Sequence, residues 1–182
     1  MEFLEKDLED LIWGAIQNDM REELIKRGLH ISTQAKFIRQ YNFGSYGICD
    51  LISFSIERYR DKQYYIYIDI FELKKDFISY QTLDQSLGYA RACQLICKEL
   101  TNASKNKKRF IPEITLNLIG KELEMKNNFS FVPSIFNCIK LYKYNFDFFK
   151  GLNFSLMEDF YITNATIKTP TLSISELRDL LC

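Results

Sequence analysis

The chain has little of what builds zinc sites, rigid loops or disulfide frameworks. Its 182 residues include three prolines, seven glycines and a single histidine, His30. The five cysteines form no Cys-x-x-Cys pair, so the sequence argues against a zinc site. Cys93 and Cys97 lie one helical turn apart, and we expect them to be small core residues of a helix. An odd number of cysteines fits reduced thiols.

An excess of charge and a long apolar run are also missing. Lys and Arg number 24, and so do Asp and Glu, which gives a formal net charge of zero. A protein that holds nucleic acid by bulk charge is usually basic, so a nucleic-acid site here has to be a local patch. No apolar run approaches membrane-spanning length, and charged residues follow Met1 closely. We therefore expect no signal peptide, no membrane association and a cytoplasmic location.

The chain does have many apolar residues, 47% of the total, in periodic patterns rich in Phe and Tyr. Helical spacing predicts helices over residues 3–27 and 82–100, and a short one over 173–181. Alternation and β-branched or aromatic content predict six strands, at residues 34–41, 48–56, 64–73, 110–119, 137–146 and 152–162. The order begins α-β-β-β-α-β, and several connections are too short for parallel crossovers. Residues 1–182 are thus predicted to form a single α/β domain with a central mixed sheet.

Two carboxylates and a lysine interrupt these apolar strands. Because side chains alternate along a strand, Glu72 and Lys74 are expected on one face at the strand's end, and Asp50 on the same face as Ile52. If the two strands pair as a hairpin, Asp50 approaches Glu72. Neighbouring carboxylates repel unless a cation lies between them, and Mg²⁺ or Mn²⁺ prefers such oxygen ligands. The pattern predicts a metal site beside a lysine, with a plain strand-end ion pair as the alternative.

Gln85 and Tyr89 follow on the next predicted helix, four residues apart and therefore on one face. Thr82 and Gln85 also have the spacing of a capping box, in which case Gln85 caps the helix and Tyr89 packs in the core. Either interpretation places the start of this helix near the end of the strand that carries Glu72.

Together, Asp50, Glu72-x-Lys74 and Gln85-x-x-x-Tyr89 resemble the PD-(D/E)XK, restriction-endonuclease-like superfamily, in particular its RecB-type and NucS-type nuclease domains. The segment over residues 5–12, EKDLEDLI, is similar to the first helix of those domains, so the resemblance spans about residues 3–100. Ile-Cys precedes Asp50 where the superfamily name implies a proline.

The resemblance implies a three-layer αβα fold, with the motif-bearing core at about residues 3–119. Residues 120–182 lie outside the resemblance, and their pattern predicts additional strands and a C-terminal helix. It implies a Mg²⁺- or Mn²⁺-dependent nuclease that hydrolyses phosphodiester bonds, with DNA as the expected substrate. Asp50, Glu72 and the backbone carbonyl of Leu73 would bind the metal. Lys74 would be catalytic, and Gln85 would orient the site.

Four further residues complete the predicted site. Glu5 would add a carboxylate from the first helix, whereas Glu9, its rival one turn later, is expected on a solvated face. Arg39, Lys75 and Tyr89 are candidates for contact with nucleic acid. The alternative function is a catalytically inactive, nuclease-like module that binds nucleic acid or protein within a larger complex. A homodimer is a further expectation, because cutting two strands requires two sites.

Overall fold

The N-terminal region forms two helices, which corrects the single helix predicted over residues 3–27. The computed structural model describes residues 4–60, 62–105, 107–124, 132, 136–147 and 149–157. Helix α1 spans Glu5–Gln17 and α2 spans Arg21–Lys26. Between them Asp19 has a positive φ of 57°, a left-handed conformation that a right-handed helix does not continue through. Gly28, with a φ of +94°, follows the end of α2, where a left-handed conformation commonly ends a helix.

The six long strands agree with the predicted ones to within a few residues, except that β8 ends at Leu156 and the predicted strand ran to 162. They are β1 (Lys36–Asn42), β2 (Ile48–Arg58), β3 (Gln63–Leu73), β4 (Phe77–Ile78), β5 (Arg109–Gly120), β6 (Glu122–Leu123), β7 (Ile139–Asp147) and β8 (Gly151–Leu156). A 3₁₀ turn, η1, covers Gly44–Tyr46, and helix α3 covers Tyr80–Ala103. The two-residue strands β4 and β6 were not predicted. The helix predicted at 173–181 and the end of the strand predicted at 152–162 lie outside the described residues.

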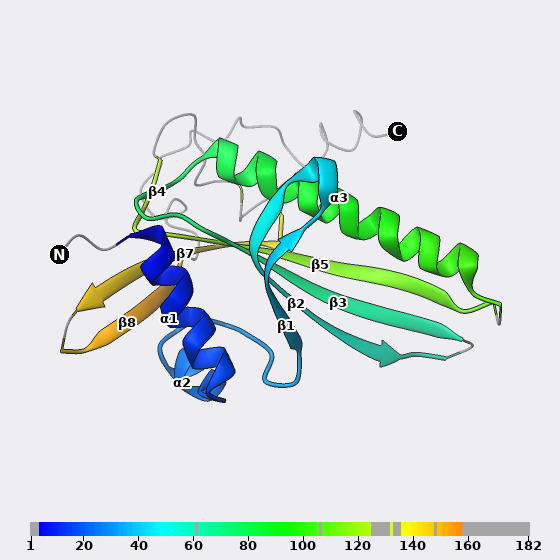
Figure 1. Cartoon of the computed structure of the whole chain (residues 1–182), viewed down its shortest axis with the longest axis horizontal. Coiled ribbons are helices and arrows are strands. Elements are labelled where there is room, and N and C mark those ends of the chain that lie inside the picture. Colours follow the sequence, from blue (N-terminus) through cyan, green and yellow to red (C-terminus); the bar gives the residue numbers. More distant parts are fainter. Residues whose placement is uncertain are drawn as a thin grey trace, which may run out of the picture.

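Six strands form one mixed sheet in the order β1-β2-β3-β5-β7-β8, as Figure 1 shows. The two central pairs, β3 with β5 and β5 with β7, are parallel, and the other three pairs are antiparallel. The predicted mixed sheet is thus confirmed, including the β2–β3 hairpin. Short strands β4 and β6 pair in parallel beside it.

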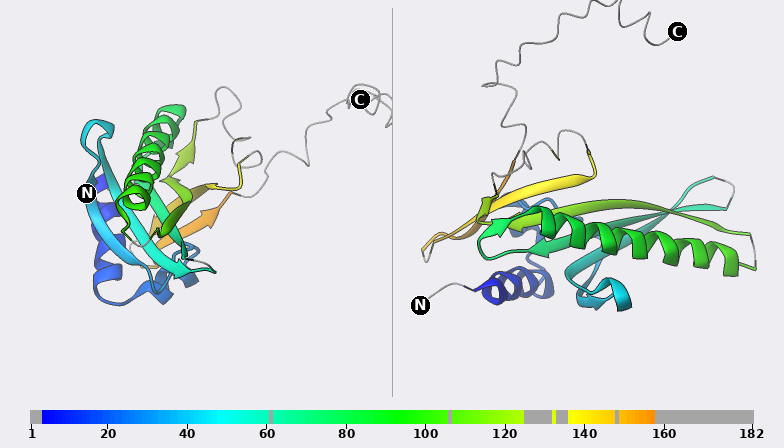
Figure 2. Two further views of the ribbon diagram at one scale, coloured as in Figure 1. Left: turned by 90° about the vertical axis from the view of Figure 1, so that its right-hand side faces the viewer. Right: turned by 90° about the horizontal axis from the view of Figure 1, so that it is seen from above.

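Helices cover both faces of the sheet. α3 packs along one face, and α1 and α2 lie against the other (Figures 1 and 2). Neighbouring residues of β3 therefore belong to different cores: Ile70 packs in the cluster with α3, and Phe71 in the cluster with α1 and α2. This arrangement explains why β3 is apolar on both faces and can bury a carboxylate near its end. Within the described part of the chain, no helix is long and apolar enough to cross a membrane.

Helix α3 begins two residues earlier than predicted, and its cap is not the predicted one. Ser79 is the N-cap: its hydroxyl accepts a hydrogen bond from the Thr82 N–H at 3.4 Å, and the Ser79 N–H donates to the Thr82 hydroxyl at 3.2 Å. Thr82 therefore closes the capping box as its third helical residue, and Gln85 does not cap the helix. This start places the side chain of Gln85 one turn into the helix.

Candidate active site

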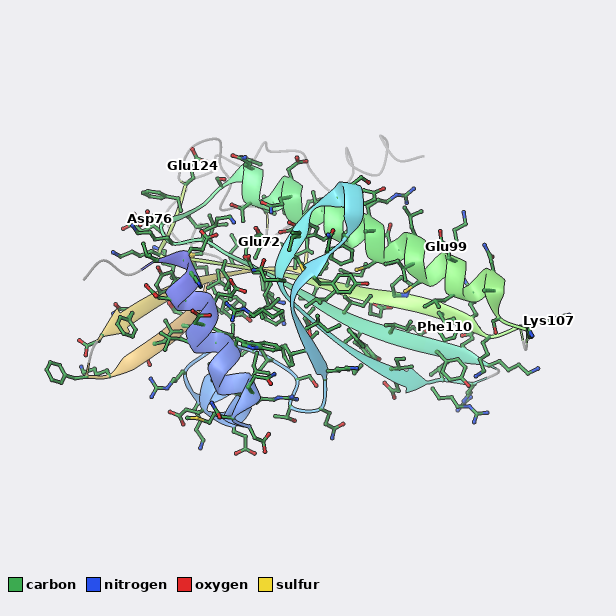
Figure 3. The ribbon with its side chains drawn as sticks, in the orientation of Figure 1. Glu72, Asp76, Glu99, Lys107, Phe110 and Glu124 are labelled. Atoms are coloured by element: carbon green, nitrogen blue, oxygen red, sulfur yellow. The ribbon has the colours of Figure 1, made fainter. Side chains whose placement is uncertain are left out.

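The β2–β3 hairpin brings Asp50 and Glu72 together, as predicted. Leu51 pairs with Phe71, so Asp50 and Glu72 occupy facing positions one step further along the two strands. The Leu73 N–H donates to Asp50 Oδ2 at 2.7 Å, which ties the Asp50 carboxylate to the end of β3. Figure 3 shows Glu72 in the interior, where the sheet passes beneath the start of α3.

Glu72 is almost fully buried, with 1% of its surface exposed. One oxygen, Oε1, accepts a hydrogen bond from Lys74 Nζ at 2.8 Å, whereas Oε2 is buried without a partner among the described residues. Burial, followed by the nearby charge of Asp50, raises the pKa of Glu72 to about 7, against the opposing effect of Lys74. A buried carboxylate oxygen with no donor is costly, so this oxygen is a place for a cation or a water molecule.

Lys74 lies between two acids. Its Nζ is 2.8 Å from Glu72 Oε1 and 3.7 Å from Glu5 Oε1. Burial lowers the pKa of Lys74, but Glu72 and the other carboxylates raise it more, so the side chain is held as an ammonium ion. Glu5 Oε2 also accepts a hydrogen bond from the Lys75 N–H at 3.2 Å. The first helix therefore delivers Glu5 to the end of β3, where the sequence placed it.

The donor set suits a hard divalent cation. Burial raises the pKa of Asp50 as well, although the Leu73 N–H and Lys74 oppose that rise. The buried carboxylate of Glu72 and the half-buried one of Asp50 are then harder to ionise than in water unless a cation compensates them. Among the described residues, no three His, Cys, Asp or Glu side chains lie close enough to hold an ion by themselves. A magnesium ion fits such a pair, because it usually takes one or two carboxylates and keeps several waters.

A chain of two hydrogen bonds links Gln85 and Tyr89 of α3 to the start of β2. Gln85 Nε2 donates to the Tyr89 hydroxyl at 2.6 Å, and that hydroxyl donates to the Ile48 carbonyl oxygen at 2.7 Å. Tyr89 is fully buried and stacks on Phe43, with ring centroids 5.4 Å apart. The predicted contact of Tyr89 with nucleic acid therefore needs correction: its ring has no exposed face, and its hydroxyl positions the backbone two residues before Asp50.

Arg39 and Glu9 are joined in an ion network beside the site. Arg39 Nε lies 2.6 Å from Glu9 Oε1, and Arg39 Nη2 lies 2.5 Å from Asp10 Oδ1. Glu9 is 8% exposed, which corrects the prediction of a solvated position. Arg39 was a candidate for phosphate contact, but the structure gives its guanidinium two carboxylate partners within the chain.

Sequence reasoning missed Gln40. Its Nε2 donates to Glu9 Oε1 at 2.8 Å and lies 3.5 Å from Asp50 Oδ1, so it bridges the ion network and the predicted metal ligand. A polar residue in a short strand carries no signal of this role. The bridge depends on α1 lying over β1.

The densest basic cluster of the chain is the loop before β5, which includes Lys105, Lys107 and Lys108. This loop lies far from the residues described above. Gln63 pairs with Arg109 at one end of β3, and Leu73 pairs with Ile119 at the other. Lys107 accordingly lies beyond the far end of the β3–β5 pair from Glu72, as Figure 3 shows. This separation leaves the loop outside the candidate site. No protein-family model, curated protein or solved structure matches the chain.

Proposed function

We propose that the chain is a metal-dependent nuclease with a restriction-endonuclease-like fold, acting on DNA. The observation that carries the proposal is the buried, unpartnered Oε2 of Glu72 beside Asp50 and Lys74. A purely structural ion pair would leave no reason to bury an unpartnered carboxylate oxygen of Glu72 beside the half-buried carboxylate of Asp50. The order α1-β1-β2-β3-α3-β5, with the short elements α2, η1 and β4 left out, and helices on both faces of a mixed sheet also agree with that fold.

Asp50 and Glu72 would hold Mg²⁺ or Mn²⁺, with the backbone carbonyl of Leu73 as a further ligand. When bound, such an ion polarises a phosphodiester oxygen and lowers the pKa of a coordinated water. The Leu73 N–H keeps Asp50 Oδ2 in place at 2.7 Å, so the carboxylate is oriented before a ligand arrives. Preorganisation of this kind avoids reorganisation during the reaction.

Lys74 would act as a cation in this site. Of the roles open to it (orienting a water, removing its proton, or neutralising charge), its raised pKa favours the last, because the ammonium form persists at neutral pH. A positive charge there stabilises the extra negative charge that develops on the phosphate oxygens. Glu5, 3.7 Å from Lys74 Nζ, would keep the ammonium group at the site when Glu72 turns to a metal ion.

Cleavage of plasmid DNA tests the proposal. With Mg²⁺ or Mn²⁺ the wild type is expected to cut, and Asp50→Asn and Lys74→Ala are each expected to lose at least about a hundredfold of the rate. Asp84→Asn is the matched control, because Asp84 is exposed on α3 and should leave cleavage unchanged. Activity that survives chelation of metal, or that Asp50→Asn retains, would contradict this function.

A second candidate is a nuclease-like module that binds a partner and does not cut. An apolar groove of about 300 Å³ between the β1–β2–β3 face and α3 favours it; Ile38, Tyr41, Phe54, Ile66, Ile96 and Leu100 are among its lining residues. Calorimetry with Mn²⁺ separates the two candidates. A heat of binding that Asp50→Asn abolishes supports the enzyme, and binding of DNA or protein without any metal effect supports the module.

A further inference from the structure

Gln40, in the middle of β1, has a backbone conformation that residues other than glycine rarely adopt. Its φ is +50°, in the left-handed region, and no other residue of β1 has a positive φ. Such a conformation costs free energy and persists only where surrounding contacts hold it, often at functional sites.

The alternation of side chains reverses at this point in two neighbouring strands. Phe37 packs in the cluster with α1 and α2, but Tyr41 packs against the cluster with α3, although strict alternation would put both on one face. In β2, Cys49 and Leu51 likewise belong to opposite clusters. The reversals coincide, because Arg39 pairs with Leu51 and Tyr41 with Cys49.

Gln40 and Asp50 are the residues at which the two strands reverse, and they face each other in this register. Asp50 therefore lies where the alternation of β2 breaks, and its Oδ2 accepts a hydrogen bond from the Leu73 N–H at the end of β3.

The Gln40 amide completes the set of donors around Asp50. Its Nε2 lies 3.5 Å from Asp50 Oδ1 and donates to Glu9 Oε1 at 2.8 Å, while Asp50 Oδ2 accepts from Leu73. Each oxygen of Asp50 therefore faces a donor from a different strand. Glu9 is itself anchored by Arg39, so the amide is held from the side of α1.

We propose that Gln40 is a positioning residue of the metal site: its left-handed backbone turns the side-chain amide onto Asp50 and Glu9 and so orients the Asp50 carboxylate for the ion. This inference rests on the proposed metal-dependent function. Donors around a metal ligand typically change metal affinity by about 10- to 100-fold when they are removed. Gln40 acts through Asp50 and does not touch the ion.

Gln40→Gly removes the amide and leaves the backbone free to keep its φ. We expect a folded protein whose Kd for Mn²⁺, measured by calorimetry, is about tenfold weaker or more. Lys62→Gly is the matched control: Lys62 also has a positive φ, 64°, but lies in the β2–β3 loop at the far end of β3 from Glu72. The Kd of this control should equal that of the wild type.

Gln40→Asn provides a second variant, because asparagine tolerates the left-handed region and its amide is one methylene shorter. The same weakening of Mn²⁺ binding is expected. If both variants bind Mn²⁺ as tightly as the wild type, Gln40 has no positioning role, and the metal site stands without it. If the wild type itself gives no heat of Mn²⁺ binding, the proposed function falls and this inference with it.

Discussion

At the scale of single residues, the defining feature of the candidate site is the burial of the Glu72 carboxylate. An exposed glutamate ionises at its ordinary pKa of 4.5, whereas burial beside Asp50 raises the pKa of Glu72 to about 7. The folded protein therefore binds a proton more tightly than the unfolded chain between these two values. Part of its stability is present below pH 4.5 and is lost as the pH rises through about 7.

Glu72→Gln should expose this effect. With metal chelated, the wild type is expected to lose up to about 3 kcal/mol of unfolding free energy, relative to the variant, between pH 4.5 and 8. The neutral amide does not titrate and can still accept from Lys74. Urea denaturation of both proteins across this pH range measures the difference. If the unfolding free energies of the two proteins change in parallel with pH, burial does not raise the pKa of Glu72 in the folded protein. Glu72→Gln should also lose Mn²⁺ binding.

At the scale of elements, two helices from opposite faces of the sheet complete one site. α1 supplies Glu5 to the end of β3, and α3 fastens the start of β2 through Tyr89. Without these contacts the strand ends would open more easily, because fewer hydrogen bonds and packing contacts hold the end of a strand than its middle. The strands thus carry the proposed metal ligands, and contacts with the helices hold them in position.

Tyr89→Phe should remove the hydrogen bond that holds the start of β2 to α3, while the aromatic ring still fills its place in the core. The ring still stacks on Phe43, but the Ile48 carbonyl loses its 2.7 Å donor, at an expected cost of about 1–2 kcal/mol in urea denaturation. Because Asp50 lies two residues later, we also expect weaker Mn²⁺ binding in calorimetry. Gln85→Ala is the control for the outer hydrogen bond alone, and it should cost less. Equal effects of the two variants would place the important contact at Gln85 instead.

At the scale of the whole molecule, charge is balanced and the densest basic cluster is remote from the site. Lys and Arg equal Asp and Glu in number, and Lys107 lies beyond the far end of the β3–β5 pair from Glu72 (Figure 3). We expect DNA bound at the site to contact chiefly Lys74 and Lys75 at the end of β3, and to miss the basic loop before β5. Little of its affinity would come from the release of counterions.

The salt dependence of DNA binding measures this. With Asp50→Asn to prevent cleavage, a plot of log K against log salt should have a slope of only about −2, as two phosphate contacts give. Fluorescence anisotropy over about 50 to 200 mM salt suffices for the slope. A slope of about −5 or steeper would mean that the DNA runs along the sheet to the loop near Lys107, and the matching variant would be Lys107→Ala.

Much of the fold was predictable because its signals are local. Alternating and β-branched runs located the strands of the large sheet, and short connections implied that part of it is antiparallel. The break between α1 and α2 was missed because the helical spacing of apolar residues continues past Asp19. The sequence pattern does not indicate that the backbone of Asp19 is left-handed. Ser79 was missed as a cap because Thr82 offered an equally good capping pattern.

The sequence by itself determined which residues had to be explained: Asp50, Glu72 and Lys74 on apolar strands, and Gln85 with Tyr89 on a helix. Spacing along an element is a local property, so it could be read directly. Only the tertiary structure decided that Tyr89 is buried, that Glu9 pairs with Arg39, and that Gln40 and Asp50 reverse their strands together. Burial and pairing arise where distant segments pack against one another, and no local pattern records which segments will meet.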